Sequence, residues 1–173
     1  MKIVSRLLFS LFILLLTVPA DSQEVVNSKL TSVYLHNFIK YVNWSKHQST
    51  DPFIIGIFDD DETYQNIRSS LEGTKVEDAV INVVEFHTVS EINHCDLLFI
   101  PSSRSSAIQN IASSLDQKQI LIVTTGQQMT KKGAALSLMM VNDKLKFELS
   151  EYNIKKAGLK VSNQLMMLAV IVD

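Results

Sequence analysis

The stretch FIIGIFDDDETYQNI, residues 53–67, decides the fold, because a short apolar run leads directly into three aspartates and then into a helical pattern. The run is apolar throughout instead of alternating, which is typical of a strand covered on both faces. Asp60 or Asp61 can accept hydrogen bonds from the free N–H groups at the start of the following helix. The stretch therefore predicts a strand and helix unit of an α/β sheet.

Three further segments have the same continuous apolar character and are predicted as strands: residues 80–86, 95–100 and 120–124. Helices are predicted over residues 26–44, 61–71 and 103–115, from apolar positions at three- and four-residue steps or from capping residues. Buried strands that alternate with helices are typical of a mostly parallel sheet between two helical layers.

The C-terminal third follows a different pattern. Residues 134–141 and 144–149 predict an antiparallel hairpin at the edge of the sheet. Helical residues then continue to Ala157, Gly158 interrupts them, and a last helix begins after a capping Ser162. The predicted fold class is a three-layer Rossmann-like α/β sheet, mostly parallel with a C-terminal antiparallel hairpin and with helices on both faces.

The N-terminus has the pattern of a signal peptide, because Lys2 and Arg6 precede a mainly apolar run over residues 7–18. A spanning helix needs about 20 apolar residues, so an uncleaved anchor is the weaker alternative. We expect residues 1–20 to be removed and residues 21–173 to form a single domain. Removing the two signal-peptide cations changes the formal net charge from −2 to −4, which argues against nucleic-acid binding.

Cys95 is the only cysteine, so an intramolecular disulfide cannot form. A buried inert thiol, an intermolecular disulfide and a catalytic thiol remain open. His94 is adjacent, but neighbouring residues on a strand point to opposite faces, so the two side chains are poorly placed to share a metal or a proton.

The three aspartates resemble the acidic pocket of a bacterial receiver domain, but Pro101 and Ser102 stand where its phosphoacceptor would be. A helix N-terminus and a weak cation site remain as interpretations of the trio. The motifs of nucleotide-binding loops, serine hydrolases and zinc proteases are absent, and the four histidines lack metal-ligand spacing. We therefore expect a protein that is not an enzyme, with no cofactor and no metal.

Open α/β sheets bind ligands in a crevice at the carboxyl ends of their strands. Ser102, Ser103 and Arg104 follow the third predicted strand and are the candidate ligand-binding residues, for an anionic metabolite such as a carboxylate or phosphate. The alternative is that a serine caps the helix while Arg104 is solvated. Trp44, at the end of the first helix, is either a core residue or a ligand-stacking residue.

The segments SVYLHNFIKYVNWS (32–45), FIIGIFDDD (53–61), CDLLFIPSS (95–103), ILIVTT (120–125) and LKFELSEYNIKKAGLKVSNQLMMLAVIV (145–172) together resemble the YfiR family of secreted regulators. The resemblance covers nearly the whole mature chain. Its most specific parts are the aromatic helix that ends in Asn43 and Trp44, and the C-terminal stretch.

The resemblance implies a periplasmic protein that binds a membrane-bound diguanylate cyclase, holds it inactive and so controls biofilm formation. It also implies a homodimer. Cys95 matches one cysteine position of the family but has no partner, so redox sensing through an intramolecular disulfide is not expected here. A small-molecule sensor domain that serves another envelope system, such as a sensor kinase, is the alternative.

The last predicted helix has apolar residues on all sides over residues 165–172, so a second surface or the domain itself must cover it. Methionine is common at adaptable interfaces. The candidate interface with a second copy or a target protein consists of Gly158, Leu159, Val161, Met166 and Met167. Ordinary core packing of the same segment is the alternative.

Overall fold

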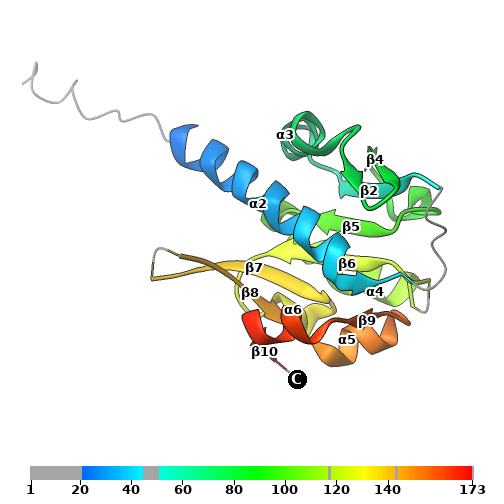
Figure 1. Ribbon diagram of the computed structural model, residues 1–173, viewed down its shortest axis with the longest axis vertical. Helices are drawn as coiled ribbons and strands as arrows, with labels where there is room; N and C mark the ends of the chain where they lie inside the picture. The colour runs from blue at the N-terminus through cyan, green and yellow to red at the C-terminus, as the bar shows by residue number, and fades with distance from the viewer. Residues whose placement is uncertain (1–20, 45–50, 117, 143, 173) are drawn as a thin grey trace, which may run out of the picture.

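An eight-stranded sheet forms the centre of the computed structural model, which describes residues 21–44, 51–116, 118–142 and 144–172 (Figure 1). The predicted signal peptide lies outside these residues. The strand order is β10-β8-β7-β6-β5-β2-β4-β3. Its strands are β2 (Phe53–Phe58), β3 (Lys75–Val76), β4 (Ala79–Phe86), β5 (Leu97–Ile100), β6 (Leu121–Thr125), β7 (Leu136–Val141), β8 (Lys144–Leu149) and β10 (Val170–Ile171).

Helices cover both faces of this sheet, and a small second sheet joins the segment after α2 to the segment before α6. The helices are α2 (Asp21–Tyr41), α3 (Asp61–Leu71), α4 (Ile108–Ser114), α5 (Glu151–Lys156) and α6 (Asn163–Leu168). Short 3₁₀ helices are η1 (Val89–Glu91), η2 (Ser102–Ala107) and η3 (Met129–Lys132). Strand β1 (Val42–Asn43) pairs antiparallel with β9 (Lys160–Val161). Among the described helices, none is both long and apolar enough to cross a membrane.

The topology confirms the predicted fold class. Strand β2 lies between β4 and β5 and is parallel to both. The chain therefore adds β4 on one side of β2 and then crosses over to add β5 on the other side. Strands β6 and β7 continue the parallel arrangement, and β7 and β8 form the predicted antiparallel hairpin. The point between β2 and β5 is therefore the topological switch point, where sheets of this kind open a crevice.

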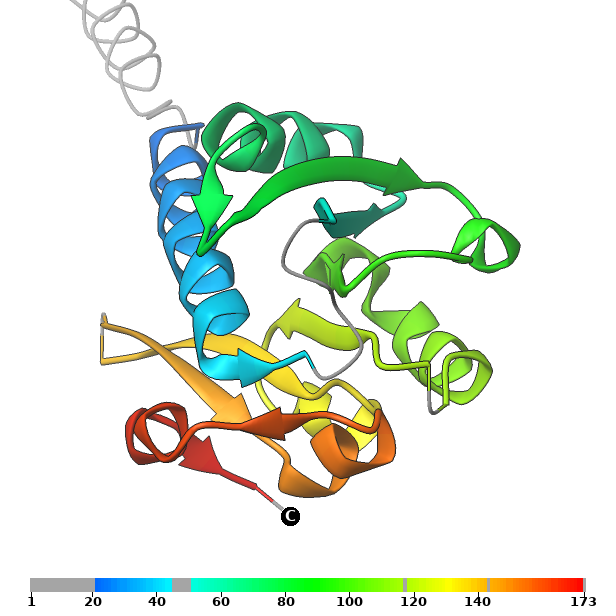
Figure 2. The same ribbon diagram turned by 45° about the vertical axis from the view of Figure 1, so that its right-hand side comes forward.

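Alternating side chains divide the core into two halves. In β5, Leu97 and Phe99 face a cluster that includes α2 and α3, whereas Leu98 and Ile100 face a cluster that includes α4. Figure 2 shows α2 and α4 on opposite sides of the strands. Because all four side chains are buried, the strand has no polar face, which explains the continuous apolar run in its sequence.

Three boundaries differ from the sequence expectation. The hairpin is not at the edge of the sheet, because the short strand β10 pairs in parallel with β8 outside it. Helix α2 ends at Tyr41, since residues 42 and 43 pair with β9. Helix α6 is capped by Ser162 as predicted, but it ends at Leu168, so the apolar residues beyond it belong to β10 instead of a helix.

Candidate functional site

A cavity of about 510 Å³ lies at the carboxyl ends of the central strands, where the switch point predicts a crevice. Residues after β2, β5 and β6 line it, and α2 and β7 contribute to its wall. Asp60, Ser102 and Ser103 are among the lining residues. The structure thus brings two of the three predicted ligand-binding residues to one cavity.

Asp60 connects the two sides of the switch point. Its side chain accepts a hydrogen bond from the Thr63 N–H at 3.0 Å, which caps α3, and another from the Ser103 hydroxyl at 2.7 Å. Burial raises the pKa of the Asp60 carboxyl, but the hydrogen bonds from Thr63 and Ser103 lower it by a larger amount. The pKa of Asp60 therefore lies below its usual value. The cavity wall therefore carries a negative charge at neutral pH.

Arg104 does not belong to the wall of the cavity. Its Nε lies 3.0 Å from Asp59 Oδ2 and donates to the Asp59 carbonyl oxygen at 2.7 Å. Its backbone N–H donates to Pro101 within the 3₁₀ turn η2. The expectation of a serine cap is wrong, because the start of η2 has no side-chain cap and Ser103 bonds to Asp60 instead. Arg104 is exposed as the alternative expected, but it pairs with Asp59.

The lining of this cavity is mixed in polarity and has an acidic balance. Asp60 and Glu62 contribute carboxylates, and no lysine or arginine is among the described lining residues. The apolar part of the wall comes mainly from Phe99, Leu138 and Met140. Such a wall repels an anion, so the chemistry of the cavity favours a neutral or positively charged ligand over the anionic metabolite expected from the sequence.

The three consecutive aspartates do not converge on one point. Asp59 has a left-handed backbone conformation, with φ of 49°, and pairs with Arg104. Asp60 caps α3, and Asp61 is the first residue of that helix. The helix-start interpretation of the trio is therefore confirmed for Asp60, while the three side chains take separate partners.

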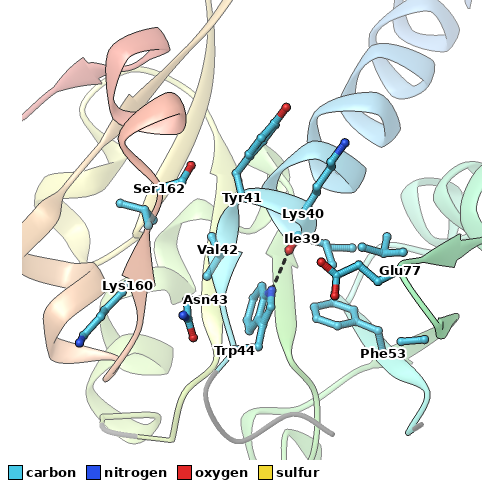
Figure 3. Close-up of a pocket in the computed structure, with 13 residues that line it drawn as sticks. Ile39, Lys40, Tyr41, Val42, Asn43, Trp44, Phe53, Glu77, Lys160 and Ser162 are labelled. Atoms are coloured by element: carbon cyan, nitrogen blue, oxygen red, sulfur yellow. Dashed lines mark hydrogen bonds between the residues drawn. The ribbon is translucent and has the colours of Figure 1, made fainter. Parts of the chain in front are cut away.

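A second cavity, of about 590 Å³, lies at the opposite end of β2, around Trp44 (Figure 3). The Trp44 indole N–H donates to the Ile39 carbonyl oxygen at 2.8 Å, and the ring meets Phe53 edge to face at 4.9 Å. The bond satisfies one of the last carbonyl groups of α2, which have no partner within the helix. Trp44 therefore has a structural role: its indole satisfies a carbonyl group in the last turn of α2 and packs against Phe53 of β2.

Four exposed apolar residues of the consecutive elements α6 and β10 are together called the C-terminal apolar surface. Met167 is 85% exposed and Leu168 is 71% exposed, at the end of α6, while Val170 and Ile171 in β10 are each 42% exposed. Figure 1 shows both elements at the same end of the sheet, beside β8. Apolar residues gathered at an unpaired sheet edge are typical of an interaction site.

The predicted interface residues divide into two groups. Met167 is exposed, Gly158 is exposed in a left-handed turn, and Met166 and Val161 are half-buried. Leu159 is only 3% exposed and belongs to the core, so it is removed from the candidate interface. Leu159 is therefore a core residue, whereas Met167 lies on the outer surface.

Cys95 is buried and free, next to an exposed His94. Burial, together with the nearby charge of Asp96, raises the pKa of the Cys95 thiol to about 12. Because the thiolate is the reactive form, this cysteine is expected to be inert in the folded protein.

The reactivity of Cys95 can be measured with a chromogenic disulfide reagent at pH 8. We expect negligible modification of the native protein over minutes and complete modification in guanidinium chloride, which exposes the thiol. Rapid reaction of the native protein would contradict the buried, protonated state and would reopen the possibility of an intermolecular disulfide.

Comparisons with known proteins identify the family of this chain. A family model described as YfiR/HmsC-like matches residues 28–170. A search of curated proteins found no significant match. Among solved structures, the crystal structure of an ABC domain in complex with L-Trp from Streptococcus pneumonia is similar, with a TM-score of 0.49 and 11% sequence identity over 70% of this chain and 55% of that chain.

Proposed function

Because this chain belongs to the YfiR/HmsC-like family, we propose that it is a periplasmic regulator that binds and inhibits the periplasmic domain of a membrane-bound diguanylate cyclase. Members of this family are known as regulators rather than enzymes. Inhibition of the cyclase would lower cyclic di-GMP and restrain biofilm formation. The predicted signal peptide supports export to the periplasm.

The observation that carries this proposal is the C-terminal apolar surface. Burying the exposed area of Met167 and Leu168 against a partner would remove apolar surface from water. The hydrophobic effect is the main favourable contribution to most protein association. Strand β10 is at the edge of the sheet, so its outward backbone groups are open to a further strand. A folded domain of the cyclase that presents an apolar patch or an edge strand would fit both features.

A second copy of this chain is the other occupant that we expect for this surface. Homodimers commonly use the same patch on both subunits, and exposed apolar side chains of α6 and β10 can contribute to one. We propose that dimerisation and cyclase binding compete for it. Sedimentation of the purified protein, with and without the cyclase domain, distinguishes the two assemblies.

The direct test is co-purification from an envelope fraction, followed by mass spectrometry and a cyclase assay. We expect a diguanylate cyclase to be recovered and its synthesis of cyclic di-GMP to fall when this protein is added. Recovery of a sensor kinase alone would keep the role of regulator but replace the target. A recovered cyclase whose activity is unchanged would contradict inhibition.

The cavity at the switch point supports a second candidate function, the binding of a small molecule. Its acidic wall favours neutral and positively charged ligands, so in a thermal-shift screen we expect stabilisation by members of those classes and none by dicarboxylates or phosphate. The Arg104→Ala variant should retain the same ligands, since Arg104 lies outside the wall. Stabilisation by a dicarboxylate that depends on Arg104 would contradict this assignment.

A further inference from the structure

Three side chains with metal-binding atoms converge outside both cavities. Asp61 is the first residue of α3, Glu85 lies near the end of β4, and His87 follows that strand. Side chains two residues apart on a strand point to the same face, which explains why Glu85 and His87 lie together. The turn from β2 into α3 brings Asp61 beside them, because β2 and β4 are parallel neighbours.

The distances within this group are close to those of a metal site. One donor atom from each residue lies within 4.8 Å of the other two. Donor atoms around a tetrahedral ion with bonds of about 2.1 Å are about 3.4 Å apart, so small rotations of these side chains would bring all three into contact with one ion. The His87 side chain is 60% exposed, and its Nδ1 lies 3.8 Å from Asp59 Oδ1, a contact that such a rotation would change.

The charges of the group also favour a cation. The carboxylates of Asp61 and Glu85 lie together in this group, and like charges at short range repel each other. A bound divalent cation would remove this repulsion. Glu85 is meanwhile held in place, because its Oε1 accepts a hydrogen bond from the Asp60 N–H at 3.1 Å.

The nearby guanidinium of Arg104 is already paired with a carboxylate. Its Nε lies 3.0 Å from Asp59 Oδ2. Asp60 caps α3 and Asp61 lies in its first turn, where the helix dipole favours both negative charges. Arg104 therefore does not pair with Asp61 or Glu85.

We propose that Asp61, Glu85 and His87 form a binding site for a divalent first-row transition ion, with Zn²⁺ as the representative ion. An imidazole nitrogen favours ions of this class, whereas Mg²⁺ and Ca²⁺ prefer oxygen donors alone. Three protein donors leave a coordination position for water, as in zinc sites that are open to solvent. The ion would join the start of α3 to the end of β4.

Isothermal titration calorimetry of the full mature chain, freed of any histidine tag, tests this site with ZnCl₂ as the probe. We expect one Zn²⁺ per chain, with binding weakened at least tenfold in His87→Ala and in Glu85→Gln. The second variant keeps an acceptor oxygen for the Asp60 N–H, so it removes charge without removing that hydrogen bond. The His94→Ala variant is the matched control, because it removes an exposed histidine outside the group, and it should bind like the wild type.

A second measurement is the midpoint of thermal unfolding, which should rise with Zn²⁺ in the wild type and in His94→Ala, but not in His87→Ala. Equal binding by all four proteins, or no binding by the wild type, would overturn the proposal. Binding of Mg²⁺ as tight as that of Zn²⁺ would overturn the assignment to a transition ion. The result is independent of the proposed function, because this site lies outside the C-terminal apolar surface.

Discussion

Replacement of Phe38 by alanine is expected to lower the free energy of unfolding by about 3–5 kcal/mol, the range for removing a fully buried aromatic side chain. Phe38 is 1% exposed, and its ring meets Phe147 of β8 edge to face at 5.1 Å and Tyr34 at 5.9 Å. The substitution would thus leave a cavity between α2 and the sheet. Since whole domains are stable by only about 5–15 kcal/mol, this loss is a large part of the total.

Urea denaturation followed by circular dichroism measures this effect. The midpoint should fall while the slope with denaturant stays the same, because the surface exposed on unfolding changes little. Val33→Ala is the matched control, since Val33 lies on the same helix but is 56% exposed, and it should change stability by less than about 0.5 kcal/mol. If Phe38→Ala cost less than about 1 kcal/mol, the packing of α2 on the sheet would be wrong.

Replacement of Met167 by aspartate is expected to weaken association through the C-terminal apolar surface by about 2 kcal/mol or more, on the order of 30-fold in the dissociation constant. Met167 is 85% exposed in the single chain, so the substitution should leave the domain folded. In a complex the same position would be buried, and an unpaired carboxylate there is costly. Binding to the cyclase domain, or to a second copy, is measured by surface plasmon resonance or sedimentation.

Two further variants make this result interpretable. Leu165→Asp should unfold the protein, because Leu165 is 2% exposed in the core beside Met166. Val33→Asp places the same charge on an exposed apolar residue of α2 and should bind normally. Loss of binding with Val33→Asp alone would move the interface to α2, and unfolding by Met167→Asp would show that α6 belongs to the core.

Local patterns in the sequence predicted the central strands and the caps of α3 and α6 correctly. The run of residues 53–58 matches β2, and Asp60 and Ser162 cap α3 and α6 as expected. These features depend on neighbouring residues: a strand buried on both faces needs continuous apolar side chains, and a cap needs one acceptor beside free N–H groups.

Gly56 shows where a local pattern is insufficient. In the sequence it is a weak point in an apolar strand, but in the structure a Cβ at this position would lie 2.6 Å from the Phe86 ring of β4 and 3.1 Å from Leu98 of β5. The need for glycine thus comes from two neighbouring strands, which the sequence of β2 does not identify.

The candidate site was only partly predictable for the same reason. Ser102 and Ser103 were placed in the crevice from the end of a predicted strand, but the pairing of Arg104 with Asp59 depends on which strand lies beside β5. The sequence also gave no signal that His87 and Glu85 lie beside Asp61. Asp61 is far from Glu85 and His87 in the sequence, and only the parallel pairing of β2 with β4 brings the three residues together.

The sequence by itself determined the α/β class, the central strands and the caps of α3 and α6, because each follows from the polarity and hydrogen bonding of adjacent residues. The tertiary structure alone decided the two-residue strands β1, β3, β9 and β10, which are too short to show a periodic pattern. It also decided that Leu159 is buried while Met167 is exposed, although both belong to the candidate interface predicted from the sequence. Burial depends on which face of a helix or turn meets the sheet, and that is fixed by distant strands.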